Sequence, residues 1–276
     1  MRKILKDSFR YPFSDWKKFI ILGIILFISS VPVRSFGLTS ETIILLFVFV
    51  GFFTGFFING YLFRIVKSSI KSFEGLPEFN MWLQMFEDGV KVFAVFLVYI
   101  VVPVTLLIVA VILISDFDHS FVFNNFPSMI QTMGINPLEY LTSGIMPAIL
   151  SIVELNFILF PQLGFIVIIL LLVLLPIFFI AIAGMAYDGG EFRSGFMFHD
   201  VVADIKDIGL KKLIIWYLVT GVIFSVIFIV SNILNYLLFT LNIFIIGEIV
   251  LIILITYSYI FYTRSLGLLY RDDPKE

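Results

Sequence analysis

The chain has 276 residues but no cysteine, few charged residues and only two histidines. The lack of cysteine excludes disulfides, thiolate catalysis, iron–sulfur clusters and Cys-based zinc sites. Charged residues make up 14% of the sequence, whereas a soluble domain has about 25%. The net charge of −2 offers no general attraction for nucleic acid. Because no phosphate-binding loop, His-Glu-x-x-His or Gly-x-Ser-x-Gly motif occurs, we expect no catalytic residue, metal site, cofactor or enzymatic activity.

Apolar residues are abundant, at 61% of the chain, and the mean hydropathy is +1.10. They form six runs, at about 19–33, 43–63, 92–115, 164–187, 213–234 and 243–263. Five runs are long enough to cross about 30 Å of hydrocarbon as helices. The first rises only about 22 Å, so its flanking Lys17, Lys18 and Arg34 would have to reach outward to the headgroups. It lacks a signal-cleavage pattern, so we expect it to be retained as a span.

The distribution of Lys and Arg sets the number and direction of the spans. Every basic residue except Arg34 lies in residues 1–18, 64–91, 188–212 or 264–276. Six spans place all of these segments on one side, whereas five or seven spans would divide them between both sides. We therefore predict an all-α bundle with six transmembrane helices, forming a single integral membrane domain over residues 1–276. It would be a multi-pass protein of the cell membrane with both termini in the cytoplasm.

The long outer connection, residues 116–163, contains no Lys or Arg and has a strongly apolar second half. We expect residues 141–160 to form a helix that either lies in the outer interface or enters the membrane and returns. The sequence favours neither alternative.

Helical apolar spacing precedes the first, third and fifth spans, and predicts interfacial amphipathic helices there. Each of these three segments also has an aspartate shortly before a lysine, at Asp15, Asp88 and Asp207. This likeness suggests a three-fold repeat of helical hairpins. Alternatively, basic inner loops alone would produce part of the similarity.

Small residues at Gly51, Gly55 and Gly60 could bring the second span close to a neighbour. The fourth span carries a matching group at Ala181, Ala183, Gly184 and Ala186. We expect packing within the bundle, with a homodimer contact as the alternative.

Polar residues in or near the spans are the candidate site residues. Glu248 lies about 8 Å below the outer boundary, where it could form a cation or proton site with Glu154 or with an asparagine of the 232–242 turn. The simpler interpretation is a carboxylate that reaches water at the interface. Asn59 is a candidate because a polar cavity of Asn59 with Thr54, Thr105, Thr220 and Thr256 would favour transport.

A second set of candidate residues consists of basic side chains that could hold anionic lipid headgroups. Its members are Lys17, Lys18, Arg64, Lys91, Lys211, Lys212 and Arg264.

Several stretches resemble one known family. They are Tyr11-Pro12-Phe13-Ser14-Asp15-Trp16-Lys17-Lys18, Gly60-Tyr61-Leu62-Phe63-Arg64, Leu76-Pro77-Glu78-Phe79, Trp82, and Phe86-Glu87-Asp88-Gly89. Over about residues 9–270 the chain is similar to the domain of unknown function 4013 family of mainly archaeal multi-spanning membrane proteins. The resemblance implies an archaeal cell membrane, and it implies no activity or functional residue.

Together these features predict an integral membrane protein of unknown molecular function that is non-enzymatic and engages lipid or a membrane protein partner. The alternative is a transporter or permease-like protein for a small uncharged solute or lipid, which the repeat supports. A polar midplane cavity would favour this alternative, and a solid bundle would favour a structural role.

Overall fold

The structure is a computed structural model that describes residues 1–29, 41–114, 161–241 and 243–271. These residues form helices joined by short turns, and no strand occurs among them, which confirms the all-α prediction. The principal helices are α1 (Arg2–Arg10), α2 (Trp16–Ser29), α3 (Glu41–Ile70), α4 (Trp82–Phe96), α5 (Val102–Ile114), α9 (Pro161–Tyr187), α10 (Phe198–Ile208), α11 (Leu210–Thr240) and α12 (Phe244–Arg271).

Five helices in the described ranges are long and apolar enough to cross a membrane. These segments match predicted spans two to six, and are Phe49–Ile70, Trp82–Ala110, Gly164–Tyr187, Leu210–Leu238 and Ile245–Arg271. The predicted first span falls on α2, of which 14 residues are described. The five long apolar helices indicate a multi-pass membrane protein. The remaining predicted crossing, at α2, stays a prediction.

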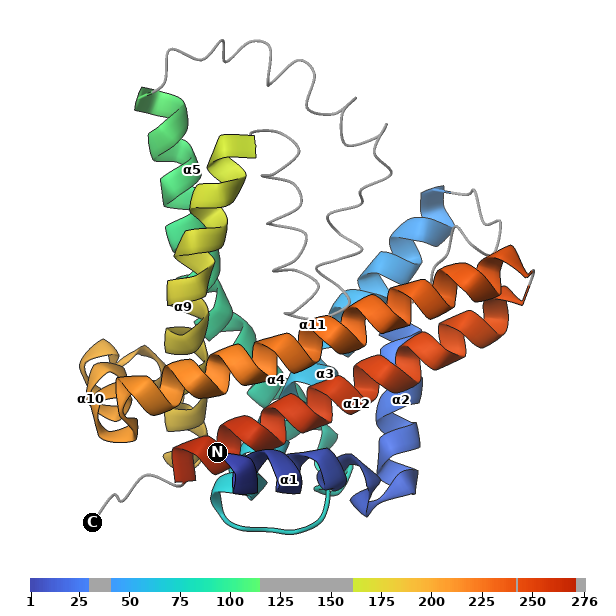
Figure 1. Cartoon of the computed structure of the whole chain (residues 1–276), viewed down its shortest axis with the longest axis horizontal. Coiled ribbons are helices and arrows are strands. Elements are labelled where there is room, and N and C mark those ends of the chain that lie inside the picture. The colour runs from blue at the N-terminus through green and yellow to red at the C-terminus, as the bar shows by residue number, and fades with distance from the viewer. Residues whose placement is uncertain (30–40, 115–160, 242, 272–276) are drawn as a thin grey trace.

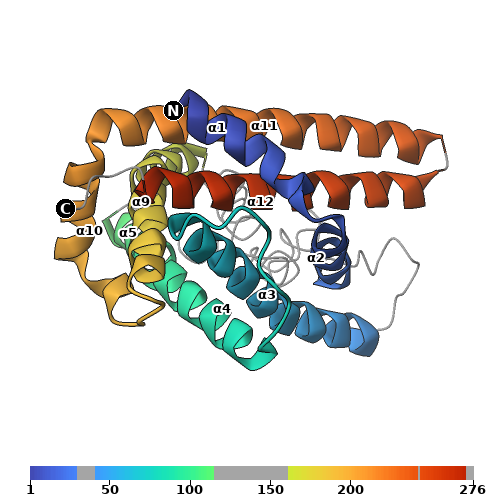
Figure 2. The same ribbon diagram turned by 90° about the horizontal axis from the view of Figure 1, so that it is seen from below.

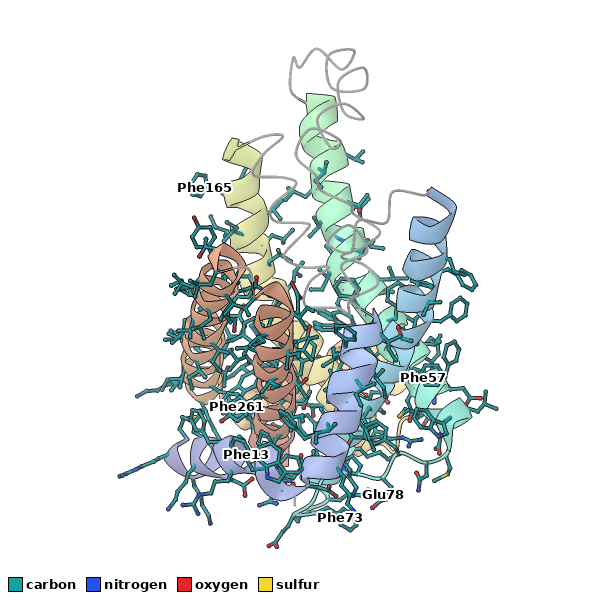
Figure 3. All side chains as sticks on the ribbon, turned by 90° about the vertical axis from the view of Figure 1, so that its right-hand side faces the viewer. Phe13, Phe57, Phe73, Glu78, Phe165 and Phe261 are labelled. Atoms are coloured by element: carbon teal, nitrogen blue, oxygen red, sulfur yellow. The ribbon has the colours of Figure 1, made fainter. Side chains whose placement is uncertain are left out.

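Helix α3 is central to the packing, because it contacts α2, α4, α9 and α12, and α11 packs along α12. In Figure 1, α5 and α9 stand side by side, whereas α11 and α12 cross the view obliquely. Helix α1 lies across α12 at the lower end, as the view from below shows (Figure 2). We call this end, with α1, the 71–81 loop and the turn after α9, the basic end. Figure 3 places Phe73 and Glu78 there and Phe165 toward the opposite end.

A separate short helix precedes the first and fifth predicted spans but not the third. Helix α4 continues through a π-helical turn, Leu97–Val101, directly into α5. Pro103 follows this turn and has no N–H to donate, which fits the local departure from α-helical bonding. The interfacial helix predicted before span three is therefore the first part of the candidate span Trp82–Ala110 itself. Helix α1 precedes α2, and α10 precedes α11.

Helices α3 and α4 cross at two glycines. A β-carbon on Gly60 would lie 1.7 Å from the carbonyl oxygen of Met85, and one on Gly89 would lie 1.8 Å from that of Phe56. Only glycine permits backbones to approach this closely. Span two thus packs tightly on span three, and α3 also contacts α9, in which Ala181 and Ala183 are fully buried. Of the predicted small residues of α9, Gly184 faces Asp204 of α10 and Tyr270 of α12.

Some predictions fall outside the described residues. They concern Arg34, Glu154 and the interfacial or re-entrant helix at 141–160.

Candidate functional site

Helix α1 has one face against the protein and one face exposed. Ile4 and Ser8, four residues apart, are buried, and Ser8 Oγ donates to the carbonyl of Ile4 at 2.9 Å. Lys3, Lys6 and Arg10 are exposed and follow the spacing of one helix face. The helix therefore holds three cations outward while its apolar side packs on α12.

Arg264 of α12 ties α1 to the rest of the basic end. It is 3% exposed, and its Nε donates to Asp7 Oδ1 at 2.8 Å. One guanidinium NH2 group donates to the carbonyl of Phe73 at 2.7 Å and to Ser69 Oγ at 3.3 Å. The guanidinium carbon lies 4.2 Å from the ring centroid of Tyr11, a cation–π arrangement. This one side chain joins α1, α3, α12 and the loop after α3.

Tyr11 completes the junction. Its hydroxyl donates to the carbonyl of Gly75 at 2.8 Å, and burial raises the pKa of the phenol. The ring therefore stays neutral and apolar beneath the Arg264 cation at physiological pH.

A surface pocket of about 370 Å³ opens beside this junction. Its walls combine four basic with two acidic side chains, and the lining residues are Lys3, Lys6, Asp7, Arg10, Tyr11, Ser14, Glu74 and Arg264. The Arg264 guanidinium neutralises Asp7. Among the described residues, Lys3, Lys6 and Arg10 form no ion pair within 4.0 Å, so three cations face one remaining carboxylate, Glu74. A phosphate or carboxylate group is the ligand that this charge pattern favours.

Lys18 belongs to a separate junction between α2 and the loop. Its Nζ lies 2.7 Å from Glu78 Oε1 and 3.3 Å from Asp15 Oδ2, and donates to the carbonyl of Leu76 at 2.8 Å. Partial burial opposes the charged form, but the two carboxylates prevail and raise the pKa of Lys18. Asp15 also caps α2, accepting from the backbone N–H groups of Lys17 and Lys18. Both hydrogen bonds lower the pKa of Asp15, and the one from the backbone N–H of Lys18 has the larger effect.

Two more predicted lipid contacts bind protein carbonyls. The Arg64 guanidinium donates to the carbonyls of Asn80 at 2.6 Å and Met81 at 3.0 Å. Lys91 Nζ donates to the carbonyl of Gly190 at 3.0 Å and lies 3.7 Å from Asp88. Lys67 holds the adjacent carbonyl of Gly189. These side chains fix loops of the basic end.

The predicted cations therefore fall into two groups. Lys18, Arg64, Lys91 and Arg264 bind other parts of the protein, whereas Lys17 and Lys211 are exposed and Lys212 is half-buried. Contact of any of them with lipid stays a prediction. Lys3, Lys6 and Arg10 were predicted only as members of the basic segment 1–18 and not as a separate set, although their spacing on one helix face could have revealed it.

Glu248 is half-buried, and Asn235 Nδ2 lies 3.5 Å from its Oε1. The partner is an asparagine from the predicted 232–242 region, as the cation-site hypothesis required, but this region is not a turn, because α11 continues to Thr240 and Asn235 lies within it. The distance is also at the limit of a hydrogen bond. Within the described ranges, no group of three or more His, Asp or Glu side chains could hold a metal ion. A cation or proton site at Glu248 stays a prediction.

The threonines do not build the polar cavity that would favour transport. The hydroxyls of Thr54, Thr220 and Thr256 each donate to a carbonyl one turn back in their own helix, and Thr105 is exposed. Asn59 instead lines an apolar cavity among α3, α4, α9, α11 and α12.

Comparison with family models gives one match, over residues 43–236, to the family described as "Protein of unknown function (DUF4013)". The match is narrower than the expected range of about 9–270 and leaves out α1, α2 and α12. No curated protein and no solved structure matches the chain.

Proposed function

The chain belongs to the DUF4013 family of proteins of unknown function, and from this premise we propose that it is a non-enzymatic membrane protein that engages anionic lipid headgroups through α1. The proposal includes the cell membrane, archaeal by resemblance, as its location. It also places the basic end and both termini in the cytoplasm.

The observation that carries the proposal is the pocket beside α1. Lys3, Lys6 and Arg10 are exposed around it, and Arg264 has already neutralised Asp7. A basic residue near an anionic membrane surface contributes about 1 kcal/mol. The three cations together could therefore distinguish an anionic headgroup from a zwitterionic one.

The position of α1 supports the same function. Its buried face packs on α12, a candidate span, and Arg264, Tyr11 and Ser69 hold it in place. A lipid headgroup would thus meet a preorganised cationic surface rather than a free tail.

Native mass spectrometry of the purified protein tests this proposal. The protein would be exchanged into nanodiscs containing equal phosphatidylglycerol and phosphatidylcholine, and the lipids retained on release would be counted. We expect retained phosphatidylglycerol to exceed phosphatidylcholine. The triple variant Lys3→Gln, Lys6→Gln, Arg10→Gln should lose most of this preference.

The matched control is the triple variant Lys71→Gln, Arg193→Gln, Lys206→Gln, which removes three exposed cations that lie outside the pocket and outside the predicted lipid contacts. It should keep most of the preference. Equal retention of the two lipids by the unaltered protein would contradict the proposal. Equal losses in both triple variants would also contradict it, because only overall charge would then matter.

A further inference from the structure

A second cavity, of about 90 Å³, lies inside the bundle where five helices meet. It is lined by Asn59, Leu62, Phe63 and Val66 of α3, Val92 of α4, Phe178, Phe179 and Ile182 of α9, Phe224 of α11, and Tyr259, Tyr262, Thr263 and Leu266 of α12. No charged side chain is among these residues. The volume is several times what one buried water needs.

Three polar side chains of this cavity are deeply buried. Asn59, Tyr259 and Tyr262 are 8%, 9% and 8% exposed. In the part of the chain that the structure describes, none of the three side chains forms a hydrogen bond. The hydroxyl of Thr263, in contrast, donates to the carbonyl of Tyr259 at 2.7 Å. Buried polar groups normally have partners, so three without one at a single cavity point to a ligand.

The surrounding aromatic rings hold the wall in place. The Tyr262 ring centroid lies 4.9 Å from that of Phe179 and 5.3 Å from that of Trp216. Trp216 is itself fixed, because its indole N–H donates to Ser265 Oγ at 3.3 Å. The tyrosine hydroxyl is therefore presented from a packed surface.

The cavity is lined by residues of five candidate membrane spans and lies near the basic end. Asn59 precedes Arg64 by five positions in α3, which corresponds to about 8 Å along the helix. Leu62, Phe224 and Thr263 are only partly buried, so the cavity is not fully sealed from the membrane.

We propose that this cavity binds an uncharged, lipid-soluble molecule with an apolar chain and one oxygen acceptor, such as a long-chain alcohol or ketone. The aromatic and aliphatic lining contacts the first carbons of the chain, and the rest of the chain leaves the cavity past the partly buried Leu62, Phe224 and Thr263. The hydroxyls of Tyr259 and Tyr262 can donate to the two lone pairs of the oxygen, and the amide carbonyl of Asn59 can accept the hydroxyl proton of an alcohol. A charged molecule does not fit, because no side chain of the lining would neutralise it. The site is independent of the headgroup pocket at α1.

Photolabelling in nanodiscs of phosphatidylcholine tests the inference. The probe is hexadecanol with a diazirine in its chain, and the labelled peptides are identified by mass spectrometry. We expect saturable labelling of α3, α9 and α12 that excess unlabelled hexadecanol removes. Hexadecane with the same diazirine should label these peptides more weakly.

Two variants test the polar groups. The double variant Tyr259→Phe, Tyr262→Phe keeps the rings but removes both hydroxyls, and should weaken saturable hexadecanol binding about tenfold. Asn59→Leu should weaken it similarly and provides a second test if the double variant does not fold. Tyr99→Phe is the matched control, because Tyr99 is 6% exposed but does not line the cavity, and it should bind hexadecanol as the unaltered protein does.

Several results would overturn the inference. Labelling that does not saturate, or that follows the exposed face of α11, would indicate general contact with the bilayer. Absence of saturable labelling would mean that the cavity holds only water. Equal hexadecanol binding by the cavity variants and by the Tyr99→Phe control would show that the three polar groups do not contribute to binding.

Discussion

Arg10 and Arg264 line the same pocket but differ in what surrounds them. Arg264 is 3% exposed and binds Asp7, Ser69 and a backbone carbonyl, whereas Arg10 is exposed on α1. One arginine holds the helices together and the other is available to a ligand. Within one pocket, burial rather than residue type separates a structural cation from a binding cation.

The largest expected effect is that of Arg264→Met. It leaves Asp7 and the carbonyl of Phe73 without their cation, and should lower the free energy of unfolding by about 2–3 kcal/mol, since Asp7 is half-exposed. Arg10→Met should change the free energy of unfolding by less than about 0.5 kcal/mol. Thermal unfolding in detergent measures both. Equal destabilisation would erase the distinction between the two arginines.

Salt should act on the two cations differently. Raising ionic strength from about 0.1 M to about 1 M shortens the screening length from about 10 Å to about 3 Å. The preference for phosphatidylglycerol should fall several-fold, while the contribution of Arg264 to stability changes little. Lipid retention and unfolding temperature would be followed in the same salt series. A preference that persists at about 1 M would show that contacts other than exposed charge hold the lipid.

Tyr11→Phe tests the neutral partner in the junction. The variant keeps the ring beneath Arg264 but loses the hydrogen bond to Gly75, which should cost about 1 kcal/mol. Tyr99→Phe is the control, because no hydrogen bond of its hydroxyl lies within the described residues. Thermal unfolding compares the two, and a larger loss in the control would contradict the role given to Tyr11.

The smallest effect concerns Lys18. Because its pKa is raised in the folded protein, its stabilising contribution is complete below the unfolded pKa of about 10.4 and is lost as pH rises through the folded value. Glu78 is 70% exposed, so the loss should be below about 1 kcal/mol. Unfolding midpoints at neutral and alkaline pH would show it. Lys18→Met should remove this part of the pH dependence, and an unchanged profile would contradict the assignment.

The spans were predictable because hydrocarbon-spanning helices need long apolar runs, whatever their neighbours are. The continuity of α4 with α5 was not predictable from the sequence. Trp82, Phe86, Val90 and Phe93 have the spacing of a surface helix, but the inner end of a packed span has the same spacing.

The candidate sites were harder to predict, because they depend on distant contacts. Burial of Arg264 requires Asp7, which lies 257 positions away in the sequence. Asn59 was identifiable as a polar residue in a span, but its cavity forms only where five helices meet. Lys3, Lys6 and Arg10 are the exception, since their arrangement follows from helix geometry alone.

The glycine crossing of α3 and α4 has a consequence for the inner cavity. With no β-carbons between them, Gly60 and Gly89 let the two backbones touch, so a larger side chain at either position would force the helices apart. Asn59 is the neighbour of Gly60, so the place of one cavity wall depends on how closely these two backbones approach.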